Sequence, residues 1–253
     1  MSDQPDPSSR YVDLDRPPLR QEALARALAA EGWRVEVLAE ASSTNAVVAE
    51  RARAGEPPGL VVVAERQTAG RGRLDRRWES PPRAGLTFSV LLAPPPEQLS
   101  WVPLLGGLAV ATAVREQTGV DAGLKWPNDV VVADRKLAGV LAEAVDGKVV
   151  LGIGLNVTTR RAELPVEQAT SLALEAADTT DRDTLLRAVL RALAAGEDRR
   201  SAYRQLCTTL GRQVRVELPG GTAVEGTAEQ VDEQGRLVVD GVPYAAGDVV
   251  HLR

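Results

Sequence analysis

The sequence predicts an α+β domain over residues 19–210, followed by a small five-stranded β-barrel over residues 211–253. Up to residue 210, segments with apolar residues at helical spacing alternate with segments that resemble strands. From Gly211 onward, short strand-like segments are separated by Pro-Gly-Gly, Glu-Gln-Gly and Asp-Gly turn sequences. Residues 1–18 are rich in proline, serine and aspartate and are predicted to be disordered.

Four segments have the spacing typical of helices: residues 19–32, 43–55, 100–118 and 181–209. The first two end at glycines, which favour a helix stop. The second opens with "STN", whose side chains can cap a helix N-terminus or meet a polar ligand group there. Gly196 is expected to interrupt the fourth helix.

Six segments are predicted to be strands: residues 33–40, 59–66, 85–92, 124–132, 135–145 and 148–157. The first alternates between apolar and polar residues, and the second is almost continuously apolar, which is typical of a buried strand. The last three follow one another closely and are joined by short turns.

Composition excludes several classes of function. The chain has one cysteine, Cys207, and one histidine, His251, so it can form neither an internal disulfide nor a Cys/His zinc cluster. His251 lies two residues from the end, which disfavours Cys–His and Ser–His–Asp catalysis. The net charge is −5, and residues 212–253 are also acidic, so we expect no nucleic-acid partner. No signal peptide or membrane-spanning run is visible, and we expect a cytoplasmic protein.

Lysine is scarce in this chain. Of its 30 basic residues only three are lysines: Lys125, Lys136 and Lys148. Arginine does not replace lysine where a compact point charge is needed. Lys125 and Lys136 are therefore candidate functional residues. Lys148 lies in a turn-like segment and is expected to be a surface residue without a functional role.

The most basic loop is "QTAGRGRLDRRW", Gln67 to Trp78. Its glycines give backbone freedom, and exposed N–H groups together with Arg71 and Arg73 can bind an anion. Composition leaves three interpretations open: a solvated loop, a lid over an anionic ligand, or a nucleic-acid contact. Neither a phosphate-binding P-loop nor a dinucleotide-binding glycine pattern is present.

The strand "VLGIGLNV" places Gly152, Gly154 and Asn156 on one face. Glycines there indicate either a bend or bulge, or a ligand that approaches the sheet closely, and we favour the ligand. In the preceding predicted strand, residues 135–145, alternation places Lys136 and Gly139 on opposite faces. On that basis Lys136 has to reach around the start of its strand to share a site with Gly139.

The segment "KWPND" contains a turn sequence. It is compatible with a plain hairpin turn carrying surface charges. Alternatively, Lys125 and Asp129 at the strand ends suit a phosphate and its magnesium ion. Asp129 can also act as a base or fix a nearby lysine.

Taken in order, "STN", "QTAGRGRLDRRW", "KWPNDV", "RKLAG" and "GIGLNV" resemble the biotin protein ligases over residues 33–157. The resemblance implies a mixed sheet with packed helices, a class II synthetase-like fold, followed by an SH3-like C-terminal barrel. It also implies that biotin and MgATP give biotinyl-5′-adenylate, which a lysine of a biotin carboxyl carrier domain then attacks. Members of this family can pair through the edge of the central sheet, and we expect a monomer or a weak homodimer.

The resemblance also implies residue roles. Residues expected to contact biotin are Ser43, Thr44, Asn45, Gln67, Gly70, Arg71, Gly72, Arg73, Lys136, Gly139, Leu141, Gly152 and Gly154. Residues expected to contact ATP are Arg73, Arg76, Trp78, Lys125, Asn128, Lys136 and Asn156. The expected catalytic residues are Lys136, Arg71, Arg73, Asp129 and Lys125, with Mg²⁺ carried by ATP near Asp129.

Two departures from the family pattern stand out. Asp75 replaces a glycine of the usual loop, which limits backbone freedom and places a carboxylate among arginines. We expect the loop to order less readily and to retain the adenylate less well. In addition, only one helix is predicted before Trp33, too little for a helix-turn-helix. We therefore expect a ligase that is not a repressor. The alternatives are a biotin-sensing repressor and a lipoate or octanoate ligase of the same fold.

Overall fold

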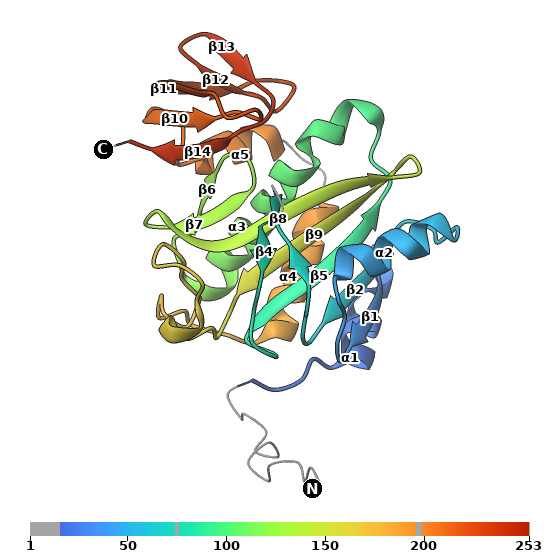
Figure 1. The fold of residues 1–253 in the computed structure, drawn as a ribbon. Helices are drawn as coiled ribbons and strands as arrows, with labels where there is room; N and C mark the ends of the chain where they lie inside the picture. The colour runs from blue at the N-terminus through green and yellow to red at the C-terminus, as the bar shows by residue number, and fades with distance from the viewer. Residues whose placement is uncertain (1–15, 74–75, 196–198, 253) are drawn as a thin grey trace, which may run out of the picture.

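The computed structural model describes residues 16–73, 76–195 and 199–252. These residues form two parts, a seven-stranded mixed sheet with helices and a five-stranded antiparallel sheet above it (Figure 1). Two short strands, β3 (Gly70–Arg71) and β4 (Arg77–Trp78), pair with each other and lie against the front of the large sheet. Both strands lie within the basic loop of the sequence, Gln67 to Trp78.

The large sheet is mixed, as the family resemblance implies. Its strands, in spatial order, are β1 (Arg34–Leu38), β2 (Leu60–Ala64), β5 (Gly85–Leu92), β9 (Lys148–Asn156), β8 (Arg135–Val145), β7 (Asp129–Val132) and β6 (Gly123–Lys125). Only β1 and β2 run parallel, and every other neighbouring pair is antiparallel. The close spacing of the last strands in the sequence therefore corresponds to a meander.

The two faces of the large sheet are covered differently. The main core joins one face to the helices α1 (Gln21–Leu28), α3 (Val102–Thr118) and α4 (Arg182–Ala194). On the other face, α2 (Thr44–Arg53) packs on a smaller cluster that includes Leu91 and Val150. The strand positions beyond this cluster carry glycines and polar residues, so that part of the face remains open to form a cavity.

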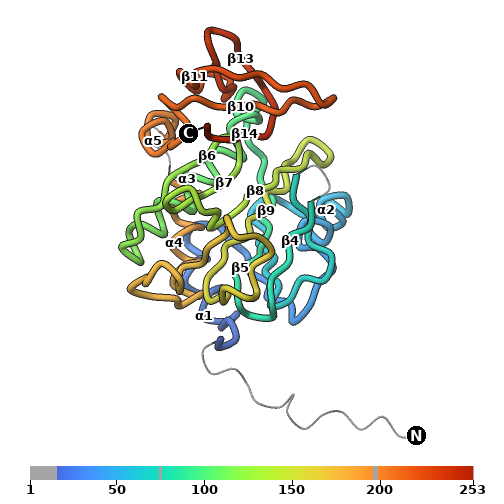
Figure 2. Tube along the Cα trace, turned by 60° about the vertical axis from the view of Figure 1, so that its left-hand side comes forward, coloured from blue at the N-terminus to red at the C-terminus, as the bar shows by residue number. Residues whose placement is uncertain are grey.

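The C-terminal sheet is SH3-like. Its strands are β10 (Gln213–Glu217), β11 (Ala223–Val231), β12 (Leu237–Val239), β13 (Val242–Tyr244) and β14 (Asp248–His251). The spatial order is β13-β12-β11-β10-β14, so among the described residues the two outer strands do not pair to close a barrel. In Figure 2 this sheet caps one end of the larger part, beside α5 (Arg199–Leu206).

Two buried tryptophans fasten the small sheet to the larger part. The indole of Trp101 donates to the carbonyl of Glu233 at 2.8 Å, and the indole of Trp126 donates to the carbonyl of Gly235 at 3.0 Å. Both acceptors lie in the turn between β11 and β12. A buried indole N–H needs an acceptor, so these bonds fix the small sheet in place.

Three expectations about secondary structure need correction. Residues 124–132 are two strands, because residues 126–128 form a turn that pairs Lys125 with Asp129. The third helix starts as a 3₁₀ segment, Pro96–Trp101, before α3. Of the tail predicted to be disordered, Arg16 is buried and paired with Glu163 at 2.6 Å. Residues 1–15 and Gly196 lie outside the described residues.

Candidate active site

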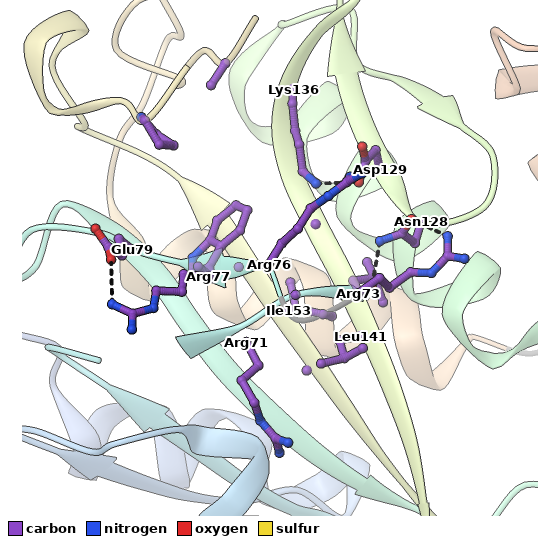
Figure 3. Close-up of a pocket in the computed structure, with 18 of the residues that line it drawn as sticks. Arg71, Arg73, Arg76, Arg77, Glu79, Asn128, Asp129, Lys136, Leu141 and Ile153 are labelled. Atoms are coloured by element: carbon purple, nitrogen blue, oxygen red, sulfur yellow. Dashed lines mark hydrogen bonds and ion pairs between the residues drawn. The ribbon is translucent and has the colours of Figure 1, made fainter. Parts of the chain in front are cut away.

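The open part of the sheet face, the "KWPND" turn and the basic loop enclose one cavity of about 580 Å³. This is the size of a small-molecule site. It brings together every residue singled out from the sequence as a site residue, except Gly70 and the undescribed Asp75. The lining includes Ser43, Thr44, Asn45, Gln67, Arg71, Gly72, Arg73, Arg76, Trp78, Lys125, Asn128, Asp129, Lys136, Gly139, Leu141, Gly152, Gly154 and Asn156. Figure 3 shows several of these side chains converging from the loop and from β8.

The strand glycines allow side chains of the protein to approach the sheet closely, whereas the sequence favoured a ligand in that space. A Cβ on Gly152 would overlap the amide of Asn45, and a Cβ on Gly154 would overlap the ring of Trp78. Gly139 is the antiparallel partner of Gly154, and a Cβ there would lie 3.3 Å from the same ring. Side chains of the protein therefore occupy the space directly above Gly152 and Gly154, and the cavity lies around them.

The N-terminus of α2 supplies polar groups to the cavity. Ser43 is its N-cap and accepts weakly from the backbone N–H of Ala46 at 3.5 Å, which agrees with the capping interpretation of "STN". The backbone N–H of Thr44 donates to Gln67 Oε1 at 3.0 Å. Asn45 Oδ1 accepts from Ser89 at 2.6 Å. These contacts fix the "STN" side chains beside the start of the basic loop.

Lys136 lies on the cavity face of β8, contrary to the parity expected from simple alternation. The register between β7 and β8 shifts, because Val130 pairs with Ala138 whereas Val131 pairs with Lys136. Leu137 is thus an extra residue, a β-bulge, which reverses the parity of the residues before it. Lys136 consequently shares a face with Gly139, and its Nζ lies 2.6 Å from Asp129 Oδ1 (Figure 3).

Lys125 is the second lysine of the cavity. Among the described residues it makes no hydrogen bond or ion pair within 4 Å, although Asp129 is its cross-strand neighbour. Burial lowers the pKa of Lys125; Asp129 opposes this shift and Lys136 adds to it. Asp129 therefore lies between two lysines and pairs with only one of them.

The loop arginines are held by acceptors from different parts of the chain. Arg71 donates to Glu143 at 3.2 Å, and Arg73 donates to Asn128 Oδ1 at 3.1 Å and to the carbonyl of Gly247 at 3.2 Å. Arg76 is paired with Asp248 of β14. Arg77 points away from the sheet toward Glu79 (Figure 3) and is 84% exposed. The loop is thus tied both to β8 and to the C-terminal sheet.

Sequence reasoning missed three of these residues: Ser89, Glu143 and Asp248. Glu143 lies on the cavity face of β8, where alternation from Gly139 could have located it, whereas Ser89 is placed there by the pairing of β5 with β9, opposite Gly152. No signal in the sequence relates Asp248 to Arg76, which lies 172 residues away.

The described residues contain no group of three or more histidine, cysteine, aspartate or glutamate side chains able to hold a metal ion. Asp129 is the carboxylate that faces both lysines, and Lys136 already pairs with it. Magnesium commonly binds through one or two carboxylates and the phosphates of a substrate. This arrangement fits an ion that arrives with a nucleotide. Within the described part of the chain, no helix has the length and apolarity needed to cross a membrane.

Two families of known proteins match this chain, and together they define its class. Residues 37–159 match the family described as "Biotin/lipoate A/B protein ligase family", and residues 209–252 match "Biotin protein ligase C terminal domain". The chain is also 42% identical to the biotin–[acetyl-CoA-carboxylase] ligase of Mycobacterium tuberculosis, over 95% of this chain and 98% of that protein. The chain therefore belongs to the biotin protein ligase family.

Solved structures agree with this assignment. The structure of the biotin protein ligase from Aquifex aeolicus in complex with biotin and ATP matches with a TM-score of 0.72 and 32% identity, over 87% of this chain and 99% of that one. The Leishmania major ligase in complex with biotinyl-5-AMP matches with a TM-score of 0.62 and 27% identity, over 87% and 98% of the two chains. The fold expected from the sequence is thus confirmed.

Proposed function

We propose that this protein is an ATP-dependent ligase that activates biotin as biotinyl-5′-AMP and transfers it to a lysine of a biotin carboxyl carrier domain. The observation that supports this most directly is the meeting of Lys136, Arg73 and the strand glycines in one cavity. The similarity to a ligase named for acetyl-CoA carboxylase, and to structures bound to biotin and ATP, supports the same reaction.

The chemistry requires no protein nucleophile. In the first step a carboxylate oxygen of biotin attacks the α-phosphorus of ATP, a P–O bond forms, and pyrophosphate leaves. In the second step the acceptor amine attacks the acyl carbon, and AMP leaves with the electron pair of the broken C–O bond. Negative charge develops in both steps, and preorganised cations stabilise it. Lys136 and Arg73 are the cations that we assign to this role.

We assign the biotin end of the cavity to the "STN" segment, Gln67 and the strand glycines. Asn45 and Gln67 offer amide groups suited to the polar ring of biotin, and Leu141 offers an apolar contact. The nucleotide end is assigned to Trp78, Asn128, Asn156, Arg76 and Lys125. Asp129 or Lys125 would accept the proton of the incoming amine, and Mg²⁺ would reach the cavity with ATP, near Asp129.

We further propose that residues 19–210 form the catalytic part and residues 211–253 a separate C-terminal module. The protein is proposed to act in the cytoplasm as a monomer or weak homodimer, without a nucleic-acid partner. The carrier domain of an acyl-CoA or pyruvate carboxylase is its proposed acceptor. Asp75, the departure from the family loop, lies outside the described residues, and our expectation of faster adenylate loss remains a prediction.

The test is incubation of the purified protein with biotin, MgATP and a carrier domain, read by avidin blot. The proposal expects biotinylation that requires both ATP and the acceptor lysine. Lipoate or octanoate supplied in place of biotin should release no pyrophosphate, and release with either acid would favour the other ligase class. Tight, sequence-specific operator binding in a gel-shift assay would instead support a repressor.

A further inference from the structure

Glu143 on β8 connects two parts of the cavity wall that are distant in sequence. Its Oε2 accepts from the Asn45 amide at 2.5 Å, and its Oε1 accepts from the Arg71 guanidinium at 3.2 Å. Its side chain is 31% exposed. By alternation from Gly139, Glu143 lies on the cavity face. One carboxylate thus joins the N-terminus of α2 to the strand that begins the loop.

The same contacts close a circuit of hydrogen bonds. An amide oxygen carries no proton, so the single hydroxyl proton of Ser89 goes to Asn45 Oδ1, at 2.6 Å. The hydroxyl oxygen of Thr44 lies 2.7 Å from that of Ser89, and Gln67 Oε1 accepts from the backbone N–H of Thr44. Gln67 and Arg71 both belong to the basic loop, four residues apart. The chain of contacts therefore starts at Gln67 and ends at Arg71, and the Glu143 carboxylate is its last link.

We propose that Glu143 is a positioning residue that couples the biotin end of the cavity to the basic loop. This inference rests on the function proposed above. Glu143 holds Asn45 in a single amide orientation, since both ends of that amide are engaged, and it holds Arg71 against β8. An ionised carboxylate is acceptor-only and serves both donors. A glutamine of the same shape has one oxygen and would present its NH₂ to the other donor.

The experiment compares the full chain with Glu143→Gln for the biotin KM, kcat and the rate of adenylate release. We expect the biotin KM and the release rate each to rise about tenfold, with kcat changed less than about threefold. Glu36→Gln is the matched control, because Glu36 pairs with Arg51 at 3.4 Å with exposures of 35% and 48%, against 31% and 54% for Glu143 and Arg71. If Glu143→Gln behaves like this control, the proposed role is overturned.

A double variant tests whether Glu143 acts on the loop through Arg71. Glu143→Gln in an Arg71→Ala background should leave adenylate release at the rate of Arg71→Ala alone, while the biotin KM still rises because the Asn45 contact is lost. Additive effects on release would contradict the coupling. A wild-type protein that forms no adenylate would overturn the proposed ligase function itself, so the two failures are distinguishable.

Discussion

Lys136 Nζ lies 2.6 Å from Asp129 Oδ1, on the cavity side of two neighbouring strands. The bulge at Leu137 makes this pairing possible, because it turns Lys136 onto the same face as Gly139. Asp129 is the anion that pairs with this lysine. In the proposed reaction, a phosphate would compete for the same ammonium group and would leave Asp129 free to meet an amine.

Lys136→Ala should therefore reduce adenylate formation to a trace while the fold remains intact. Loss of one preorganised cation at a developing charge reduces a rate by roughly 10²–10³-fold. Pyrophosphate release in the presence of biotin and MgATP measures the effect. Lys148→Ala is the control, since Lys148 donates to the carbonyl of Glu56 and does not line the cavity. A Lys136→Ala variant with a normal rate would show that the catalytic role lies elsewhere.

Alternation along a strand correctly placed the strand glycines and Asn156 on one face of the sheet, because alternation depends only on residues that are close in sequence. The same rule was wrong for Lys136. A β-bulge depends on how two strands pair, so it cannot be predicted from the sequence of one strand alone. The contacts of Asp248 with Arg76 and of Glu143 with Asn45 join distant segments. The arrangement of the small sheet determines the first contact, and no spacing in the sequence could have revealed it.

Gly154→Ala should displace the Trp78 ring, because the added Cβ would overlap it. The ring forms one wall of the cavity, so we expect the KM for the substrates to rise about tenfold. Steady-state kinetics with ATP and with biotin would measure this change. Gly107→Ala in α3 is the control, since an added Cβ there would lie at an ordinary distance of 3.4 Å from the Leu124 side chain. Unchanged kinetics in Gly154→Ala would mean that Trp78 does not shape the site.

Asp248→Ala should loosen the basic loop. The Asp248 carboxylate is paired with Arg76 and lies 3.8 Å from Arg73, so its removal takes away the side-chain anion that the C-terminal sheet supplies to the loop. Partly exposed ion pairs are weak, and we expect tryptic cleavage at the loop arginines to accelerate about twofold to fivefold. Limited proteolysis read by mass spectrometry measures the rate. Glu225→Ala is the control, because Glu225 pairs with Arg215 within the small sheet. Equal cleavage rates in the two variants would contradict a role of Asp248 in holding the loop.

The single histidine gives a direct test of electrostatics at the junction of the two parts. Burial lowers the pKa of His251 below its ordinary value of 6.5, the hydrogen bond to Asp134 opposes the shift, and the charges of Lys125 and Arg212 add to it. Between the folded pKa and 6.5, the unfolded chain binds more protons than the native chain. The free energy of unfolding should therefore rise with pH through this window and stop rising above it.

His251→Gln should flatten that rise, which lies below the ordinary histidine pKa of 6.5. Urea unfolding at several pH values measures the slope, and proton NMR of the wild type gives the pKa without assignment, since the chain has only one histidine. Asp134→Asn should lower the pKa of His251 further, because it removes the interaction that raises it. A wild-type pKa at or above 6.5 would mean that the ring is not buried against the β7–β8 turn as the structure describes.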